Sequence, residues 1–255
     1  MPLDLVTVPC LRDNYAFLIH DAATGQTAVV DVPEAGPVLA ALSQRGWRLT
    51  DILITHHHDD HIAGVAELVR ETGARVTGAR ADAHRLPPLD LAVAEGDTVQ
   101  FGADVGHVID VSGHTTGHIA YHFPGAGLAF TGDSLMAAGC GRLFEGSAAT
   151  MWRSLSKLAA LPPATLICSG HEYTASNIRF ALSLEPGNMA LISRSSQVAG
   201  DRNEGRPTVP SRLSEELATN PFLRAGLPQI KSSLGMTDAE DAAVFAEIRA
   251  RKDRF

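Results

Sequence analysis

The stretch THHHDDH, Thr55–His61, places four histidines and two aspartates in six consecutive positions, directly after the apolar run DILI. Within it, His56, His58, Asp60 and His61 follow the spacing H-x-H-x-D-H. A loop at the end of a predicted strand projects such side chains from a rigid frame. Imidazole nitrogens and carboxylate oxygens are the donors that borderline divalent metals prefer. The stretch therefore predicts a metal site, and a solvated polar loop is the alternative.

Three later fragments carry the same types of donor. His114 lies in SGHTTGH, Asp133 in FTGDS and His171 in CSGHEY, and each fragment follows an apolar β-type run and contains a glycine. Glycine lets the backbone turn sharply beside a site, and a strand end holds a ligand in place. Any one of these residues alone would be read as structural. Together with the first motif, they predict a set of seven metal ligands.

The distribution of charge argues against nucleic-acid binding. Residues 1–175 contain 10 Lys/Arg against 19 Asp/Glu, whereas residues 176–255 contain 11 against 10. All 11 histidines lie at or before His171. A phosphate backbone requires a basic stripe, which the acidic first part does not offer.

The sequence also lacks signals for export, membrane insertion and disulfide bonding. The first fifteen residues have no basic and apolar leader pattern, and no apolar run approaches the ~18 residues of a membrane span. The three cysteines, Cys10, Cys140 and Cys168, form no C-x-x-C pair. We therefore expect a cytoplasmic protein with no membrane partner.

Alternating β-type and helical patterns predict an α/β fold of four layers, an α/β/β/α sandwich rather than a doubly wound sheet. We expect a catalytic domain over residues 1–174 and a small C-terminal helical domain over residues 175–255 that binds substrate. The TDAE pattern predicts that the last helix begins with a capping box at Thr237. The other expected helices cover residues 37–46, 62–73, 150–161, 177–184 and 213–224, and the expected strands cover residues 3–8, 15–19, 27–32, 51–55, 74–78, 98–102, 105–111, 119–123, 128–132 and 165–170.

The ligand order resembles that of the metallo-β-lactamase superfamily, and further stretches resemble its glyoxalase II (hydroxyacylglutathione hydrolase) branch. These stretches are DNYAFLI, GCGRLFEG, GHEYT, PTVPSRLSEELATNPFLR and the terminal RARKDRF. The resemblance covers nearly the whole chain. It implies the metallo-β-lactamase-like sandwich and hydrolysis of the thioester S-D-lactoylglutathione to D-lactate and glutathione, the second step of methylglyoxal detoxification.

The resemblance also implies a binuclear metal centre. His56, His58 and His114 would bind one divalent ion, Asp60, His61 and His171 the other, and Asp133 would bridge both. Zinc is the first expectation and iron or manganese are the alternatives. We take the carboxylates Asp60 and Asp133 as the catalytic candidates. The remaining histidines are expected to be structural: His57 and His118 behind the ligands, and His20, His84, His107 and His122 elsewhere.

The partner implied by the resemblance is a small glutathione thioester, and we expect a monomer. Arg142 and Tyr173 match positions that contact glutathione in the family, and Arg249 and Lys252 match a C-terminal basic pair with the same role. Phe144 stands where relatives can have tyrosine, so a hydroxyl contact is absent there. Arg249 and Lys252 are three residues apart and would share one helix face.

Two kinds of alternative remain open at the level of sequence. One is another enzyme of the superfamily, such as a sulfur dioxygenase with one iron, a lactonase or a nuclease. The other is a binding module that a metal stabilises without turnover. A structural zinc site is usually closed by four ligands, often thiolates, whereas seven nitrogen and oxygen ligands for two ions leave room for water. The pattern therefore favours an enzyme.

Overall fold

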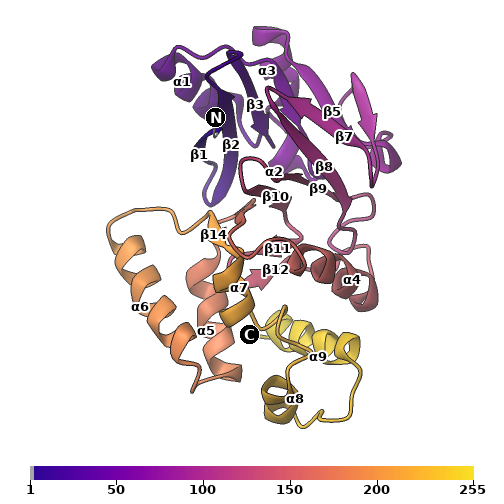
Figure 1. Cartoon of the computed structure of the whole chain (residues 1–255), viewed down its shortest axis with the longest axis vertical. Helices are drawn as coiled ribbons and strands as arrows, with labels where there is room; N and C mark the ends of the chain where they lie inside the picture. The colour runs from indigo at the N-terminus through magenta and orange to yellow at the C-terminus, as the bar shows by residue number, and fades with distance from the viewer. Residues whose placement is uncertain (1–2) are drawn as a thin grey trace. The chain divides into compact units, whose positions relative to one another are not determined.

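The computed structural model describes residues 3–255, and its chain divides into two compact units (Figure 1). Unit 1 comprises Met1–Asp110 and Thr116–Gly132, and unit 2 comprises Val111–Thr115 and Asp133–Phe255. Each unit has its own core and is described by itself below. Among the described residues, no helix is both long and apolar enough to cross a membrane.

Unit 1 contains two sheets. In the first, β1, β2 and β3 pair antiparallel and β3, β4, β5 and β6 pair parallel, in that spatial order. In the second, β10, β9, β8 and β7 are neighbours in that order and pair antiparallel. The strands are β1 (Asp4–Cys10), β2 (Asn14–Asp21), β3 (Gln26–Val30), β4 (Asp51–Leu53), β5 (Arg75–Ala79), β6 (Leu91–Val93), β7 (Thr98–Phe101), β8 (Asp104–Asp110), β9 (Ile119–Phe123) and β10 (Leu128–Gly132).

Aromatic side chains join the two sheets of unit 1 face to face. Phe17 of β2 lies 5.8 Å from Phe130 of β10 between ring centroids. Tyr121 of β9 is fully buried, and its hydroxyl donates a hydrogen bond to the carbonyl of Ile54, just after β4, at 3.0 Å. A buried phenol needs such an acceptor, so this contact fixes the spacing of the sheets. It also anchors the backbone directly before the histidine-rich loop.

The helices of unit 1 are α1 (Ala35–Arg45), α2 (Asp59–Ile62), α3 (Val65–Thr72) and the short 3₁₀ helix η1 (Arg80–Asp82). The helix that we expected over residues 62–73 is interrupted at Gly64. A Cβ atom on Gly64 would lie 2.6 Å from the backbone nitrogen of Ala35, so the chain passes too close to α1 for any side chain. The interruption leaves α2 as a single turn that carries the end of the H-x-H-x-D-H motif.

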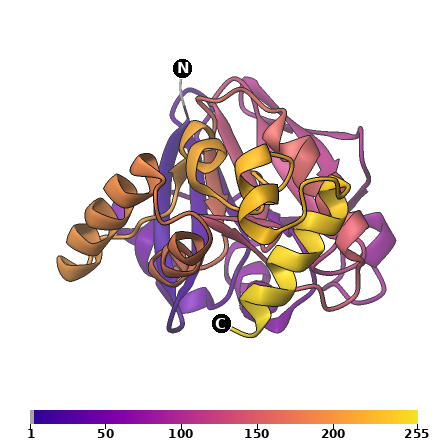
Figure 2. The same cartoon turned by 90° about the horizontal axis from the view of Figure 1, so that it is seen from below.

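Unit 2 is mainly helical, and in Figures 1 and 2 α5 lies between α6 and α9. Its β-structure is limited to the β11–β12 hairpin and the antiparallel pair β13–β14. The elements are β11 (Leu135–Met136), β12 (Gly139–Cys140), α4 (Ala148–Ala159), β13 (Leu166–Ser169), α5 (Thr174–Leu184), α6 (Met189–Asn203), β14 (Ser211–Arg212), α7 (Leu213–Thr219), α8 (Pro228–Leu234) and α9 (Asp241–Asp253).

A cluster of aromatic rings forms the centre of unit 2. Phe222 lies 6.2 Å from Phe180 of α5 and 5.8 Å from Phe245 of α9, and all three side chains are almost fully buried. Trp152 of α4 extends the cluster to Phe245 at 6.1 Å. Burying a phenylalanine side chain stabilises a fold by about 1.5–3 kcal/mol. These contacts hold α4, α5 and α9 together.

The predicted start of the last helix is wrong. α9 begins at Asp241, its N-cap is Glu240, and no side chain caps it, so the capping box at Thr237 does not form. Lys231 explains the difference, because its ammonium group donates to the carbonyl of Ala239 at 2.7 Å and pairs with Asp241 at 2.8 Å. These contacts hold the preceding residues in a turn.

Packing divides the chain at a different place from the predicted domain boundary. Residues 133–174, which include α4 and β13, group with the C-terminal helices in unit 2. The boundary after Thr174 was drawn between regions expected to have different roles, and it stays a prediction.

Candidate metal centre

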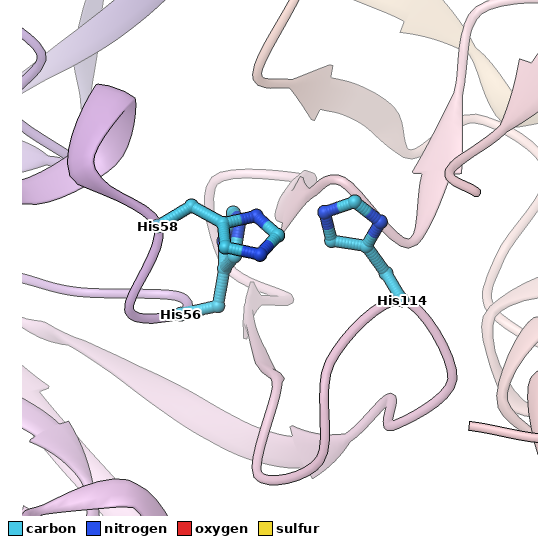
Figure 3. Close-up of side chains that lie close together, drawn as sticks. All are labelled: His56, His58 and His114. Atoms are coloured by element: carbon cyan, nitrogen blue, oxygen red, sulfur yellow. The ribbon is translucent and has the colours of Figure 1, made fainter. Parts of the chain in front are cut away.

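The histidine-rich loop of unit 1 places two ring nitrogens at the spacing of metal ligands. His56 is fully buried, and its Nε2 lies 3.1 Å from Nδ1 of His58, the N-cap residue of α2. Two nitrogens bound to one tetrahedral ion at about 2.0–2.1 Å lie about 3.3–3.4 Å apart. Figure 3 shows the two rings projecting from this loop. The two nitrogens therefore have about the spacing that two ligands of one ion would have.

Asp31, directly after β3, controls which nitrogen of His56 can bind a metal. Its carboxylate accepts hydrogen bonds from the backbone nitrogen and the hydroxyl of Thr55, both at 2.8 Å. Because the hydroxyl proton of Thr55 points to Asp31, its oxygen accepts from Nδ1–H of His56, 3.0 Å away. The lone pair of His56 then lies on Nε2, the nitrogen that faces His58.

The same carboxylate orients His61. Nδ1 of His61 lies 2.8 Å from Oδ2 of Asp31, and both residues are buried. The grouping of Asp31, His56 and His61 could itself hold an ion. Both oxygens of Asp31, however, accept hydrogen bonds from Thr55 or His61. We therefore assign Asp31 to orienting the ligands. The sequence analysis missed this residue, although TAVVD ends in an aspartate after an apolar strand, as FTGD does.

The other polar residues of the loop take separate places. The side-chain amide of Asn14 donates to Oδ2 of Asp60 at 3.0 Å, so Asp60 is held from outside the motif. Nδ1 of His57 lies 2.8 Å from Oδ2 of the fully buried Asp82, and its ring lies 5.0 Å from that of His58. His118 is buried and stacks on His56, with ring centroids 4.5 Å apart. His57 and His118 therefore contact ligand candidates through their rings, and their supporting role stays a prediction.

The three expected ligands of unit 2 meet at one carboxylate oxygen. Oδ2 of Asp133 lies 3.5 Å from Nε2 of His114 and 3.3 Å from Nε2 of His171. These distances again match those between ligands of a common ion. A single oxygen that faces two histidines has the position required of a bridging ligand. Asp133 follows β10, and His171 follows β13, so both lie at strand ends as the sequence indicated.

The backbone around Gly141 orients His114. Nδ1 of His114 lies 2.8 Å from the carbonyl oxygen of Arg142. A carbonyl only accepts, so His114 carries its proton on Nδ1 and its lone pair on Nε2. A Cβ atom on Gly141 would lie 2.0 Å from the carbonyl oxygen of Asp133 and 2.9 Å from Nδ1 of His114. Only glycine fits here, which gives GCGR a role in shaping the ligands.

Two family models together cover most of the chain. The model described as Metallo-beta-lactamase superfamily matches residues 12–171, and the model described as Hydroxyacylglutathione hydrolase C-terminus matches residues 172–255. A curated hydroxyacylglutathione hydrolase of Cereibacter sphaeroides is 71% identical over 255 residues, covering 100% of both chains. The chain belongs to the hydroxyacylglutathione hydrolase family. A relative of the same description from Ruegeria pomeroyi is 62% identical over 255 residues, again covering 100% of both chains.

Solved structures confirm the predicted metallo-β-lactamase-type α/β fold of this hydroxyacylglutathione hydrolase family member. ETHE1 from Myxococcus xanthus has a TM-score of 0.67 at 25% identity, covering 99% of this chain and 98% of that one. BLEG-1, a B3 metallo-β-lactamase, has a TM-score of 0.65 at 19% identity, covering 86% of this chain and 99% of that one. The resemblance seen in the sequence is thereby confirmed at the level of family and fold.

Two aromatic side chains that the hydroxyacylglutathione hydrolase resemblance assigns to substrate binding lie beside metal-ligand candidates in unit 2. The ring of Tyr173 stacks on His171, with centroids 4.8 Å apart and planes 5° apart. Phe144 is 61% exposed, and its ring lies 5.2 Å from that of His114. Both rings are partly open to solvent and next to a ligand, which suits the binding of a small molecule.

Arg249, one of the basic pair expected to bind hydroxyacylglutathione substrates, is buried. It is 5% exposed, its guanidinium donates to the carbonyl of Cys140 at 3.0 Å, and it pairs with Asp253 at 2.8 Å. It also lies over the ring of Phe222 at 5.1 Å. Arg249 therefore stabilises unit 2 and adds positive charge from below the surface.

Lys252, the other member of the pair, is only partly buried. Its ammonium group lies 3.4 Å from the carbonyl and the hydroxyl oxygens of Ser176, and 5.4 Å and 5.5 Å from the ring centroids of Phe180 and Phe255. Burial, followed by the positive charges of nearby arginines, lowers the pKa of Lys252 to about 8. A lysine in such surroundings favours a bound anion.

Proposed function

We propose that the protein hydrolyses the thioester bond of S-(2-hydroxyacyl)glutathione, with S-D-lactoylglutathione as the expected substrate, giving a 2-hydroxy acid and glutathione. The observation that carries the proposal is the 71% identity to a hydroxyacylglutathione hydrolase over the whole length of both chains. A domain shared with other hydrolases would support only a hydrolytic reaction. The match over residues 172–255 is what supports the glutathione substrate.

We propose a binuclear metal centre as the cofactor site. His56, His58 and His114 would hold one ion, Asp60, His61 and His171 the other, and Asp133 would bridge them. The donor set fits divalent zinc, iron or manganese, because it combines neutral imidazoles with carboxylates and contains no thiolate. The fixed Nδ1 protons of His56 and His114 support it further, since both histidines then present Nε2 as a donor.

When bound, the two metal ions would lower the pKa of water and polarise the substrate carbonyl. The residues of this chain supply the surroundings. Asp133 holds His114 and His171 at a fixed spacing, while Tyr173 offers an aromatic face beside His171. Lys252 attracts a substrate carboxylate. The leaving thiolate has a pKa near ~8.5, so its departure needs no general acid.

No cysteine in the described part of the chain is suited to act as a nucleophile. All three are buried. Burial raises the pKa of Cys10 to about 11 and that of Cys140 to about 11, and it raises the pKa of Cys168 further. Only a thiolate attacks a carbonyl readily, so these thiols are inert near neutral pH. The inert thiols therefore favour direct attack by water over a covalent route through a cysteine.

A substrate panel combined with metal analysis tests the proposal. The purified protein should contain two divalent ions per chain and hydrolyse S-D-lactoylglutathione at least about a hundredfold faster than a β-lactam, a lactone or a phosphodiester. Chelation should abolish the thioesterase activity, and added metal should restore it. A rate on any of the other three substrates that exceeds the thioesterase rate would contradict the proposal.

The lowered pKa of Lys252 predicts how substrate binding depends on pH. Below a pKa of about 8 the ammonium group is charged and attracts a carboxylate, and above it the charge is lost. Arg249, Arg179 and Arg142 lower this pKa and Asp253 raises it. KM should therefore rise about fivefold between pH 7 and pH 9, while kcat should not follow this group, because the contact is distant from the reacting carbonyl.

The variant Lys252→Met provides the comparison for this pH profile. Its KM should already be raised at pH 7 and should not show the further rise through pH 8. Steady-state kinetics at fixed ionic strength separate KM from kcat. An unchanged KM profile in the variant would assign the pH dependence to another group and remove Lys252 from substrate binding.

We further propose that residues 175–255 act as a substrate-binding domain and that the protein is a cytoplasmic monomer. The separate family model over residues 172–255 supports the first point. The three unpaired cysteines support a reducing location, because disulfides are rare there. Sedimentation of the purified protein would test the monomer.

A further inference from the structure

Three arginines of unit 2 lie close enough to Lys252 for their positive charges to act on its ammonium group. Arg142, Arg179 and Arg249 each lower the pKa of Lys252, and only Asp253 opposes them. Asp253 is itself paired with Arg249 at 2.8 Å. Such an excess of positive charge is unfavourable in the folded protein unless an anion binds to it. The cluster therefore indicates an anion-binding surface.

Two members of this basic cluster have free guanidinium groups. Within residues 3–255, no carboxylate lies within salt-bridge distance of the guanidinium of Arg142 or of Arg179, and both residues are exposed. By contrast, Arg249 is buried and its guanidinium is occupied by Asp253 and the carbonyl of Cys140. Arg179 was not among the residues expected to bind substrate.

Helix α5 places these groups at successive distances from a metal-ligand candidate. Tyr173, whose ring stacks on His171, is the N-cap residue of α5. Ser176, which contacts the ammonium group of Lys252, lies three residues further on, and Arg179 lies three residues beyond Ser176. Residues three apart are neighbours on a helix surface, so Ser176 lies next to Tyr173 and Arg179 next to Ser176, while Arg179 is turned about 120° around the helix axis from Tyr173. At about 1.5 Å per residue, Arg179 lies roughly 9 Å along α5 from Tyr173.

The two carboxylates of glutathione also lie at different distances from its sulfur. The glycine carboxylate is about six bonds away and the glutamyl carboxylate about eight, which correspond to roughly 7 Å and 9 Å in an extended chain. With the thioester beside His171 and Tyr173, the shorter arm is long enough to pass Ser176, roughly 4.5 Å along α5, and to reach the ammonium group of Lys252 beside it. The longer arm reaches the level of Arg179.

We propose that Arg179 binds the glutamyl carboxylate of the substrate and thereby selects thioesters whose carrier has two carboxylates. The inference rests on the proposed thioesterase function and adds a residue and a selectivity to it. Lys252, with the charge of Arg249 beneath it, binds the glycine carboxylate. A guanidinium can hold a carboxylate through two parallel hydrogen bonds, which a free arginine at the surface is able to form.

A pair of substrates tests this role of Arg179. One is S-D-lactoylglutathione, and the other is S-D-lactoyl-N-acetylcysteinylglycine, which keeps the thioester and the glycine carboxylate but lacks the glutamyl carboxylate. Arg179→Ala should raise KM for the first about tenfold and leave kcat unchanged. It should leave kcat/KM for the second unchanged. The preference of the wild-type protein for the first substrate should thus disappear.

Arg251→Ala is the matched control, because Arg251 is a half-exposed arginine of α9 that pairs with Glu247. It should behave as the wild type with both substrates. Metal content and circular dichroism should be the same in all three proteins. If Arg179→Ala lowers kcat/KM equally for both substrates, or for neither, Arg179 does not recognise the glutamyl group.

Calorimetric binding of S-methylglutathione and S-methyl-N-acetylcysteinylglycine separates this inference from the proposed function. These thioethers cannot be hydrolysed, so binding is measured without turnover. If the wild type hydrolyses no glutathione thioester but Arg179→Ala still weakens only S-methylglutathione, the proposed function fails and the binding role holds. If the variant binds both thioethers as the wild type does, the binding role is refuted whatever the activity.

Discussion

Replacing Asp133 with alanine is expected to lower the metal content below two ions per chain and to reduce kcat by at least about a hundredfold to a thousandfold. Oδ2 of Asp133 lies 3.5 Å and 3.3 Å from Nε2 of His114 and His171, so one oxygen serves both histidines. The loss of a direct ligand should reduce activity by more than the ten- to hundredfold reduction that follows the loss of a residue supporting a ligand. Metal analysis and steady-state kinetics on S-D-lactoylglutathione measure the two effects.

Asp238→Ala is the control for the loss of a carboxylate in unit 2, because Asp238 is exposed and lies in the turn before α9. This variant should keep two ions and normal turnover. Circular dichroism should show that Asp133→Ala remains folded, since Asp133 contributes no part of the aromatic core. An Asp133→Ala protein with two ions and near-normal kcat would refute the bridging assignment.

Replacing Glu216 with alanine is expected to produce the largest loss of stability. Glu216 of α7 is fully buried and pairs with the guanidinium of Arg194, which is itself 4% exposed. Its second oxygen accepts from the backbone nitrogen of Ala138 at 2.8 Å and from the amide of Asn220 at 3.0 Å. The variant leaves a buried guanidinium without its main partner, which costs about 3–5 kcal/mol.

For a chain of this length, that loss corresponds to a fall of roughly 6–20 °C in melting temperature. Glu215→Ala is the matched control, because Glu215 pairs with the same arginine at 3.2 Å but its side chain is 38% exposed. Its removal should cost at most about 1 kcal/mol. Differential scanning calorimetry measures both variants. Equal losses in the two would show that burial of the Glu216–Arg194 pair contributes no special stability.

The candidate metal ligands could be predicted from the sequence because the segments that contain them follow apolar strands. His56 follows β4, Asp133 follows β10 and His171 follows β13, and strand ends place their side chains reproducibly. Asp31 and Arg179 were missed for a common reason. The role of Asp31 depends on Thr55 and His61, and that of Arg179 on Lys252, and neither relation has a fixed spacing along the chain.

The helical part of unit 2 was harder to predict. α6 was not expected, although its buried residues Leu191, Arg194 and Val198 follow a helical spacing. Arg194 can occupy one of these core positions because Glu216 of α7 neutralises its charge. A pattern that counts only apolar residues does not detect such a helix. The error at Thr237 has a similar origin, since Lys231 changes the path of the chain there.

The backbone of Asp31 is strained at the position from which its carboxylate orients two ligand candidates. Asp31 has a φ of 57°, a left-handed conformation that glycine adopts without the steric cost of a side chain. Glycine, however, has no carboxylate to hold Thr55 and His61. Holding a non-glycine residue in this conformation costs of order 1 kcal/mol or more, and this cost lowers the free energy of unfolding. Asp31 holds His56 through Thr55 and holds His61 directly, so the affinity of the proposed metal centre would not be reduced by the work of arranging these side chains.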